Sequence, residues 1–163
     1  MALFRVDGPV GRAMQKMATS SWFCKVGPKV VPPTDRFLHK VTGGRVIVSR
    51  LLVPSLVLTT TGRKSGLPRE SPLACVPDPE GGWWVVGSNF GQASHPAWTG
   101  NLIATPAAEV SYEGRSYEVD AHLLSDDEKA EVWTTLTTAW PAYDQYVVSS
   151  GRNIRVFKLT PRA

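Results

Sequence analysis

The sequence has few of the residues that build metal sites and covalent catalytic centres. It contains two cysteines, Cys24 and Cys75, and three histidines among 163 residues. The cysteines lie far apart and match no ligand or disulfide-framework spacing, and the histidines are isolated from one another, so no metal site is expected. A Gly-x-Ser-x-Gly segment is also missing, which leaves a serine nucleophile with little support. If the protein is an enzyme, a bound cofactor must supply the chemistry.

Long apolar runs are missing as well. The longest candidate, residues 46–58, contains Arg50 and Pro54 and is shorter than the about 20 apolar residues that span a membrane. The N-terminus lacks the apolar centre of a secretory signal, and two unpaired thiols fit a reducing compartment, so we expect a cytoplasmic protein. A hydrophobic content of 42% and a charged content of 20% are typical of a globular chain with one core.

Positive charge is concentrated at the start of the chain. Residues 1–50 carry nine Lys or Arg and two Asp, which leaves +7 there and −3 in the remainder. The first 25 residues fit a basic amphipathic helix, and a Pro- and Gly-rich linker follows, so we divide the chain into residues 1–34 and a domain at 35–163. The helix either lies on an anionic membrane surface or docks on the domain. Nucleic acid is not the expected partner, because the aromatic residues cluster away from the basic ones.

From residue 45 onward, short apolar strands alternate with turn residues. Hairpin connections are expected at residues 77–82 and at Glu113-Gly114. One helix is expected to begin near Ser94 or His95, with Pro96 in its first turn, and a second to open with a capping box at Ser125-x-x-Glu128 and end near residue 139. The pattern predicts an α+β, mainly antiparallel fold, a small β-barrel or roll with flanking helices. The expected strands span residues 46–48, 56–61, 70–76, 83–87, 109–112, 116–124 and 154–159; a short helix is expected at 35–41.

The turn at residues 59–69 combines two glycines with three cations, Arg63, Lys64 and Arg69. Glycine lets backbone N–H groups approach a ligand closely, and Arg grips an anion through two parallel hydrogen bonds. The turn therefore predicts a phosphate or carboxylate site, with a solvated basic hairpin as the other interpretation. It is not a P-loop, because it lacks the first glycine of that motif and leads to a strand.

Two further stretches are unusual. Residues 86–101 form a strand end, a Gly/Ser/Asn loop and a helix start, where Trp98 offers a flat face for a planar ring. An ordinary loop with a core tryptophan is the alternative. Trp140, Tyr143 and Tyr146 recur every third residue, so they share one side of a helix or 3₁₀ turn, where aromatic residues more often form core than a binding wall.

Together these stretches resemble the deazaflavin-dependent nitroreductase family of actinobacteria, split-barrel reductases that use coenzyme F420. The resemblance covers about residues 51–160. It implies a split β-barrel that transfers a hydride from reduced coenzyme F420 to a quinone or nitroaromatic acceptor. An FMN-binding reductase and a non-enzymatic cofactor-binding module are the alternatives. The matching residues are, in order, 59–69, Pro72-Leu73, Gly87-Ser88, Pro96-x-Trp98, Asn101-Leu102 and Pro141-x-Tyr143-x-x-Tyr146.

The resemblance also implies roles for individual residues. Ser88, Tyr143 and Tyr146 are the predicted catalytic residues, with Tyr146 as candidate proton donor and Tyr143 also in contact with the cofactor. Trp140 and Tyr146 would border the substrate pocket. The residues that would hold the cofactor phosphate and the groups beyond it are Arg63, Lys64, Ser65, Arg69, Pro72 and Leu73. Those that would approach the deazaflavin ring are Val86, Gly87, Ser88, Asn89, Ala97, Trp98, Thr99, Gly100 and Asn101.

Three positions depart from the family pattern. Trp140 stands where members with established nitroreductase activity have Tyr, and Asn89 and Thr99 stand where a close relative has Lys and Tyr. Indole is bulkier than phenol and carries no acidic hydroxyl. These departures predict quinones rather than nitroaromatics as acceptors.

Overall fold

The computed structural model describes residues 53–163 and seven isolated positions before them, at 13, 16, 20, 26, 29, 30 and 37. The expected N-terminal helix and linker, the short helix at 35–41 and the strand at 46–48 lie outside the described residues, apart from those positions. They stay predictions, as does the domain boundary at residue 34.

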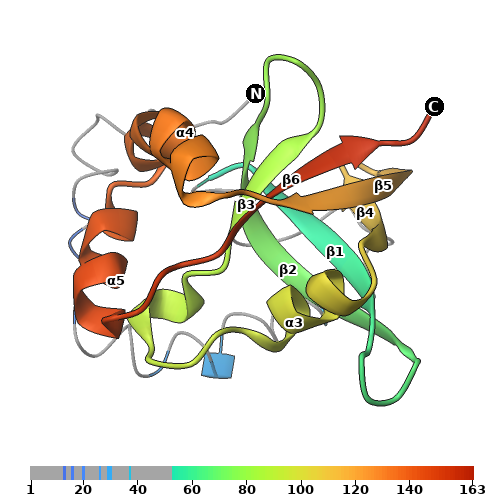
Figure 1. Cartoon of the computed structure of the whole chain (residues 1–163), viewed down its shortest axis with the longest axis horizontal. Coiled ribbons are helices and arrows are strands. Elements are labelled where there is room, and N and C mark those ends of the chain that lie inside the picture. The colour runs from blue at the N-terminus through green and yellow to red at the C-terminus, as the bar shows by residue number, and fades with distance from the viewer. Residues whose placement is uncertain are drawn as a thin grey trace.

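Six strands of the described part close into one antiparallel barrel (Figure 1). Their order around the barrel is β1-β2-β3-β6-β5-β4, and β4 pairs with β1 to complete it. The expected antiparallel barrel is confirmed. The strands are β1 (Ser55–Thr61), β2 (Pro68–Pro77), β3 (Trp83–Val86), β4 (Ala107–Tyr112), β5 (Arg115–Leu123) and β6 (Val156–Pro161).

The helices lie on the outside of this barrel. Helix α3 (Ala97–Ala104) connects β3 to β4, and a short 3₁₀ helix, η2 (Asn89–Gly91), precedes it. Helices α4 (Asp126–Ala139) and α5 (Ala142–Ser150) lie between β5 and β6 in the chain. Figure 1 shows α4 and α5 together on one side, while α3 lies at the bottom of the view, the same end as the turn between β1 and β2.

Several element boundaries differ from the expected ones by one or two residues. Strand β2 begins at Pro68, because Thr61 and Pro68 still pair across the hairpin. Strand β6 starts later than expected and continues to Pro161, which pairs with Val119. Pro96 is the N-cap of α3 rather than part of its first turn: its backbone is extended and its carbonyl accepts the Thr99 N–H at 3.2 Å.

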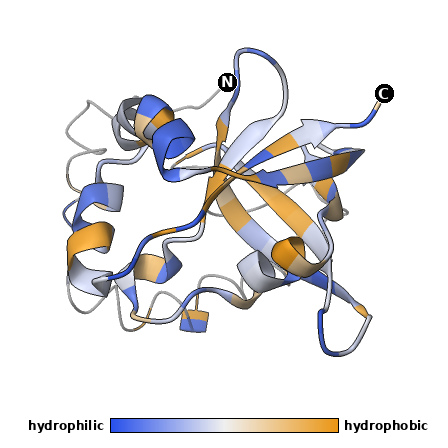
Figure 2. Ribbon diagram, in the orientation of Figure 1, coloured by the Kyte–Doolittle hydropathy of each residue, from blue (hydrophilic) through white to orange (hydrophobic). Residues whose placement is uncertain are grey.

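Two apolar clusters flank the sheet. One fills the barrel and includes Leu56, Leu58 and Phe157. The other lies between the outer face of the sheet and helices α4 and α5. Strand β3 is buried along its whole length because alternate side chains enter opposite clusters, Trp83 the first and Trp84 the second. Figure 2 shows the resulting apolar bands on the strands.

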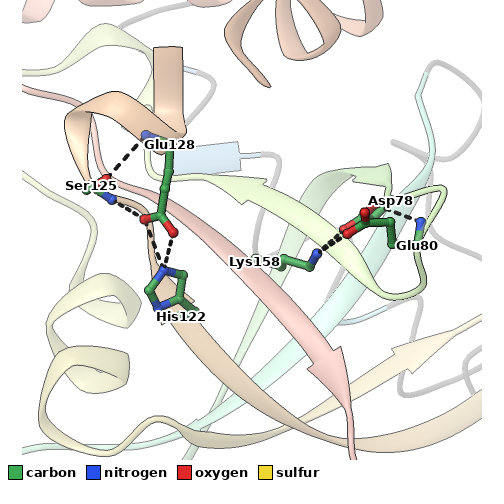
Figure 3. Close-up of polar contacts among 6 residues, drawn as sticks. All are labelled: Asp78, Glu80, His122, Ser125, Glu128 and Lys158. Atoms are coloured by element: carbon green, nitrogen blue, oxygen red, sulfur yellow. Dashed lines mark hydrogen bonds and ion pairs between the residues drawn. The ribbon is translucent and has the colours of Figure 1, made fainter. Parts of the chain in front are cut away.

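The expected capping box of α4 is present (Figure 3). The Ser125 hydroxyl accepts the Glu128 N–H at 3.2 Å, and the Glu128 carboxylate accepts the Ser125 N–H at 2.7 Å. His122 Nε2 lies 3.0 Å from both Glu128 carboxylate oxygens. The Ser125 N–H and then His122 lower the pKa of Glu128. His122 is therefore an exposed residue that supports the capping box.

The hairpin between β2 and β3 encloses a buried carboxylate. The Asp78 side chain is 2% exposed, and its Oδ2 lies 2.7 Å from the Lys158 ammonium on β6. Its Oδ1 accepts the Glu80 N–H at 2.9 Å. Burial raises the pKa of Asp78, but the Lys158 ammonium and the Glu80 N–H outweigh it and hold that pKa below its ordinary value of 3.8. Figure 3 shows the pair.

Lys158→Met removes the partner of this buried carboxylate. We expect a loss of about 1–3 kcal/mol in the free energy of unfolding at neutral pH, the cost of an unsatisfied buried group. Because the native pKa of Asp78 is lowered, its contribution is present above 3.8 and disappears as the pH falls through the native pKa. Urea unfolding at neutral pH and in this acid range checks both points.

The double variant Asp78→Asn/Lys158→Met is the matched control, since it also removes the carboxylate. Its stability relative to the unchanged protein should depend less on pH than that of Lys158→Met. A loss in Lys158→Met that is the same at neutral and acid pH would contradict the role of the ion pair.

Candidate functional site

The turn between β1 and β2 is tightly folded around its two glycines. Gly62 N–H donates to the Leu67 carbonyl at 2.8 Å, and Gly66 N–H donates to the Gly62 carbonyl at 2.7 Å. A Cβ at Gly62 would lie 2.6 Å from the Ser65 hydroxyl, and Gly66 has a φ of +67°. A side chain at Gly62 would displace Ser65, and a side chain at Gly66 would strain the backbone, so both positions favour glycine. The turn leads from one strand to the next, as expected.

The three cations of the turn are exposed to solvent, where an anion can reach them. Arg63, Lys64 and Arg69 are exposed. In residues 53–163 no carboxylate lies within ion-pair distance of any of them. Arg69 donates to the Ser65 hydroxyl at 3.3 Å, and this hydroxyl also accepts the Leu67 N–H at 3.3 Å. The turn is thus a cationic surface without an anion from the described part of the chain.

A buried asparagine of α3 fastens the turn. Asn101 is 6% exposed. Its Oδ1 accepts the Arg63 N–H at 3.1 Å, and its Nδ2 donates to the Thr60 hydroxyl at 3.0 Å. A Cβ at Gly100 would lie 2.1 Å from Arg63 Nη1, so the Arg63 guanidinium lies against the helix where Gly100 leaves room. The turn and α3 therefore form one unit.

The end of β3 passes close to the start of the same helix. A Cβ at Gly87 would lie 2.8 Å from Thr99 Cγ2, so only glycine fits there. The Gly87 N–H donates to the Arg155 carbonyl at 2.8 Å. Thr99 is fully buried; its hydroxyl donates to the Pro96 carbonyl at 2.9 Å and accepts from Arg155 at 3.1 Å. Helix α3 thus joins the cationic turn to the loop at residues 87–95, which we call the Gly87 loop.

The loop after Gly87 has an unusual backbone. Asn89 and Phe90 have φ values of +47° and +54°, in the left-handed region. The Asn89 side chain donates to the Ser94 carbonyl at 2.9 Å, so it closes the loop. Arg152 donates to carbonyl oxygens of the same loop and to His95 Nδ1, the latter at 3.0 Å. Burial, then the charges of Arg155 and Arg152, lower the pKa of His95, which is therefore neutral at physiological pH.

The aromatic residues of α5 lie on the other side of this loop. Tyr143 and Tyr146 are 4% and 3% exposed, and their ring centroids are 6.4 Å apart. A Cβ at Gly91 would lie 3.1 Å from Tyr146 Cδ1, so the loop packs directly on Tyr146. Burial, Cys75 and Tyr146 raise the pKa of Tyr143 far above that of a free phenol. Tyr143 is therefore protonated at physiological pH and does not act as a base there.

The structure thus places the three stretches singled out in the sequence in one chain of contacts, from the turn through α3 and the Gly87 loop to α5. It does not present every side chain to a ligand. Trp98 is 6% exposed and its ring lies 5.7 Å from that of Phe157, so it is the core tryptophan of the alternative interpretation. Val86 and Thr99 are buried as well, whereas Ala97 is exposed and Ser88, Pro72 and Leu73 are half-buried.

Two features of the site were not predicted. Trp140 does not share a helix with Tyr143 and Tyr146: it is the C-cap of α4, although it packs against the same cluster. Arg152 and Arg155, which hold the Gly87 loop and α3, were not identified. The only signal for them in the sequence is two arginines, three residues apart, with no acidic residue between them.

Comparison with known proteins gives these contacts a context. The model of the F420H(2)-dependent quinone reductase family matches residues 34–161. The chain is 34% identical to Rv3178 of Mycobacterium tuberculosis, which bears the same family name, over 68% of this chain and 92% of that protein. It is 31% identical to the F420H(2)-dependent quinone reductase Rv1261c of the same organism, over 67% of this chain and 74% of that protein.

A solved structure agrees with these sequence relatives. The F420-H2 dependent reductase FDR-A superposes with a TM-score of 0.59 and 33% identity, over 65% of this chain and 93% of that chain.

Proposed function

Because the chain belongs to the F420H(2)-dependent quinone reductase family, we propose that it reduces a quinone with a hydride from reduced coenzyme F420. The protein is an F420-dependent reductase, and coenzyme F420 is its cofactor. The quinone, rather than a nitroaromatic compound, is the part of the proposal that goes beyond the family. The sequence resemblance was to the deazaflavin-dependent nitroreductases, whereas the family model that matches is named for quinone reductases.

One observation carries the proposal: a cationic turn, with which no carboxylate of residues 53–163 pairs, is fastened to α3 beside a loop of close backbone contacts. Arg63, Lys64 and Arg69 fit the phosphate of the cofactor, because exposed guanidinium and ammonium groups without carboxylate partners can bind an anion at little cost. Gly100 leaves the space in which the Arg63 guanidinium lies. Ser65 lies in the same turn, and Pro72 and Leu73 lie in the middle of β2, the strand that follows it.

When bound, the cofactor supplies a hydride from its ring carbon. The chain's own residues hold donor and acceptor together, which can provide much of the rate enhancement when the reacting atoms are about 3–3.5 Å apart. In this proposal Gly87, Ser88 and Asn89 approach the ring, and the Ser88 hydroxyl hydrogen-bonds the ring or the acceptor. Hydride transfer leaves a negative charge on the quinone oxygen, and a proton must then reach that oxygen.

The role of the turn is tested by titrating the purified protein with coenzyme F420, followed by fluorescence, with FMN as the comparison ligand. Arg63→Ala, Lys64→Ala and Arg69→Ala each remove one cation. We expect each to cost about 1–2 kcal/mol, or about 5–30-fold in Kd for the cofactor. Gly100→Ala should act in the same direction, since its Cβ would displace the Arg63 guanidinium. Added salt should weaken binding to the unchanged protein.

Arg115→Ala is the matched control, because Arg115 is an exposed arginine of β5 outside the proposed site. Its Kd for the cofactor should stay within about twofold of the unchanged protein's, since a lone exposed charge contributes little. If Arg63→Ala and Gly100→Ala both bind the cofactor as tightly as the unchanged protein, the turn is a solvated basic hairpin and not the phosphate site.

Tyr146 is the proposed proton donor, and Trp140 the residue that favours quinones. Tyr146 packs on Gly91 of the Gly87 loop, and Trp140 packs against the apolar cluster that contains Tyr146. We expect Tyr146→Phe to lower quinone turnover by about 10-fold or more and to alter its pH profile, the usual effect of losing a general acid. Turnover of a quinone panel and a nitroaromatic panel across pH tests the proton donor and the acceptor preference. If Tyr146→Phe has the same turnover as the unchanged protein at every pH, Tyr146 is not the proton donor. If the unchanged protein reduces nitroaromatics faster than quinones, the proposed acceptor preference is wrong.

The basic residues at the start of the chain give a separate proposal, that residues 1–30 bind an anionic membrane surface and bring the site to a membrane-dissolved quinone. Among the described residues, no helix has the length and apolar character required to cross a bilayer. We expect salt-sensitive binding to anionic liposomes that is lost when residues 1–30 are deleted. Co-sedimentation with anionic and neutral liposomes measures it. Binding that survives the deletion, or that ignores salt, would contradict the proposal.

A further inference from the structure

Arg152 is the residue on which the Gly87 loop is built. It follows Gly151, the C-cap of α5, and precedes β6. Its guanidinium donates to four acceptors of one loop. These are the carbonyl oxygens of Gly87 at 3.0 Å, Ser88 at 2.7 Å and Gln92 at 2.9 Å, and His95 Nδ1 at 3.0 Å.

The two bonds to Gly87 and Ser88 fix the direction of two peptide groups. No peptide bond of the described chain is cis. In a trans peptide the N–H points opposite to the C=O. Since both carbonyl oxygens face Arg152, the N–H groups of Ser88 and Asn89 face away from it. Arg152 thus determines which backbone atoms the loop presents on its far side.

The backbone held in this way is one that few side chains adopt unaided. Ser88 is in the right-handed helical region, and Asn89 follows with a φ of +47°. A non-glycine residue in the left-handed region persists where the surroundings over-determine it. Arg152 and the bond from Asn89 to Ser94 provide that constraint from two sides.

A guanidinium is suited to this task in a way that an ammonium is not. Its planar fork donates several hydrogen bonds in fixed directions, whereas the Lys ammonium is a compact charge on a flexible stem. Among the described residues no carboxylate pairs with Arg152, and all four acceptors above are neutral, since Arg152 donates to an unprotonated His95 Nδ1. No ion pair with a described residue therefore neutralises the Arg152 charge, and the four hydrogen bonds of its guanidinium all go to the loop.

We propose that Arg152 is a positioning residue of the reductase: by holding the carbonyl groups of Gly87 and Ser88 it sets the backbone of residues 87–89 against the cofactor ring. This rests on the proposed function, in which these residues approach the ring. Arg152 acts through the loop and does not itself bind the cofactor, which the cationic turn retains. Loss of Arg152 should therefore affect turnover much more than affinity.

The test compares the unchanged protein with Arg152→Lys, Arg152→Ala and the control Arg162→Ala. Arg162 is an exposed arginine that pairs with Asp120 beyond the other end of β6. Four quantities are measured: the urea midpoint, the Kd for coenzyme F420 by fluorescence, kcat with menadione as the quinone, and NMR amide shifts of residues 87–95 without cofactor. The ¹⁵N shift of His95 Nδ1 reports whether its hydrogen bond is kept.

We expect Arg152→Lys and Arg152→Ala to lower kcat about 10–100-fold, the range that a small misplacement of the reacting groups produces. The Kd for coenzyme F420 should change by less than about threefold, because the cationic turn is untouched, and the Ser88, Asn89 and His95 signals should move. Arg162→Ala should leave all four quantities unchanged. Arg152→Lys keeps the positive charge, so it decides the question if Arg152→Ala does not fold.

The proposal is overturned if Arg152→Lys keeps kcat within about twofold and leaves the loop signals in place. It is also overturned if affinity for the cofactor, stability and kcat all fall together, which is the result of a merely structural role. If the unchanged protein reduces no quinone with F420, the proposed function fails. The amide signals of the free protein then decide the role of Arg152 in the loop: unmoved signals overturn it, and displaced signals support it.

Discussion

The hydrogen bonds of one buried side chain, Asn101, connect the parts of the site. Its amide accepts from the Arg63 backbone and donates to the Thr60 hydroxyl, so both of its polar atoms are used where water is largely excluded. Replacing it with an apolar residue would leave buried polar groups unpaired, and that penalty makes the arrangement specific. Helix α3 could otherwise pack on the barrel through Trp98 and Leu102 alone. The asparagine is what fixes the cationic turn relative to that helix.

Around this link, the site is assembled from places where backbone comes unusually close to its neighbours. Gly100 admits the Arg63 guanidinium, Gly87 admits Thr99, and Gly91 admits α5; at each of them a Cβ would lie within 3.0 Å of another atom. Close-packed contacts of this kind transmit displacements instead of absorbing them. Contacts run from α5 to the loop at Gly91, and Arg152 connects the same loop to the end of β3. The loop expected near the ring therefore packs against both α3 and α5.

The sequence predicted the barrel and the capping box of α4 because each follows from a local signal: apolar alternation, paired turn residues and Ser125-x-x-Glu128. It also predicted three stretches as the site, through glycines and cations grouped in short runs, and the structure brings these stretches into contact. It did not identify Arg152, and it left two interpretations of Trp98 open, for one physical reason. Whether an arginine meets carbonyl groups 64 residues away, or an indole enters the core, depends on packing between distant segments, and no spacing within a segment encodes it.

Charge grouping distinguishes the turn from other cations of the described chain. Among residues 53–163, Lys129, Lys158 and Arg162 each pair with a carboxylate, whereas Arg63, Lys64 and Arg69 are grouped in one exposed turn and pair with none. Three such cations together attract an anion more strongly than a single exposed arginine does. This selects for a phosphate-bearing cofactor, but FMN and coenzyme F420 both carry a phosphate, so the turn cannot distinguish them. Discrimination between the two must come from the ring side of the site, where we propose that Gly87, Ser88 and Asn89 present backbone whose direction Arg152 sets. In that proposal the choice of cofactor and the rate of the reaction depend on the same short loop.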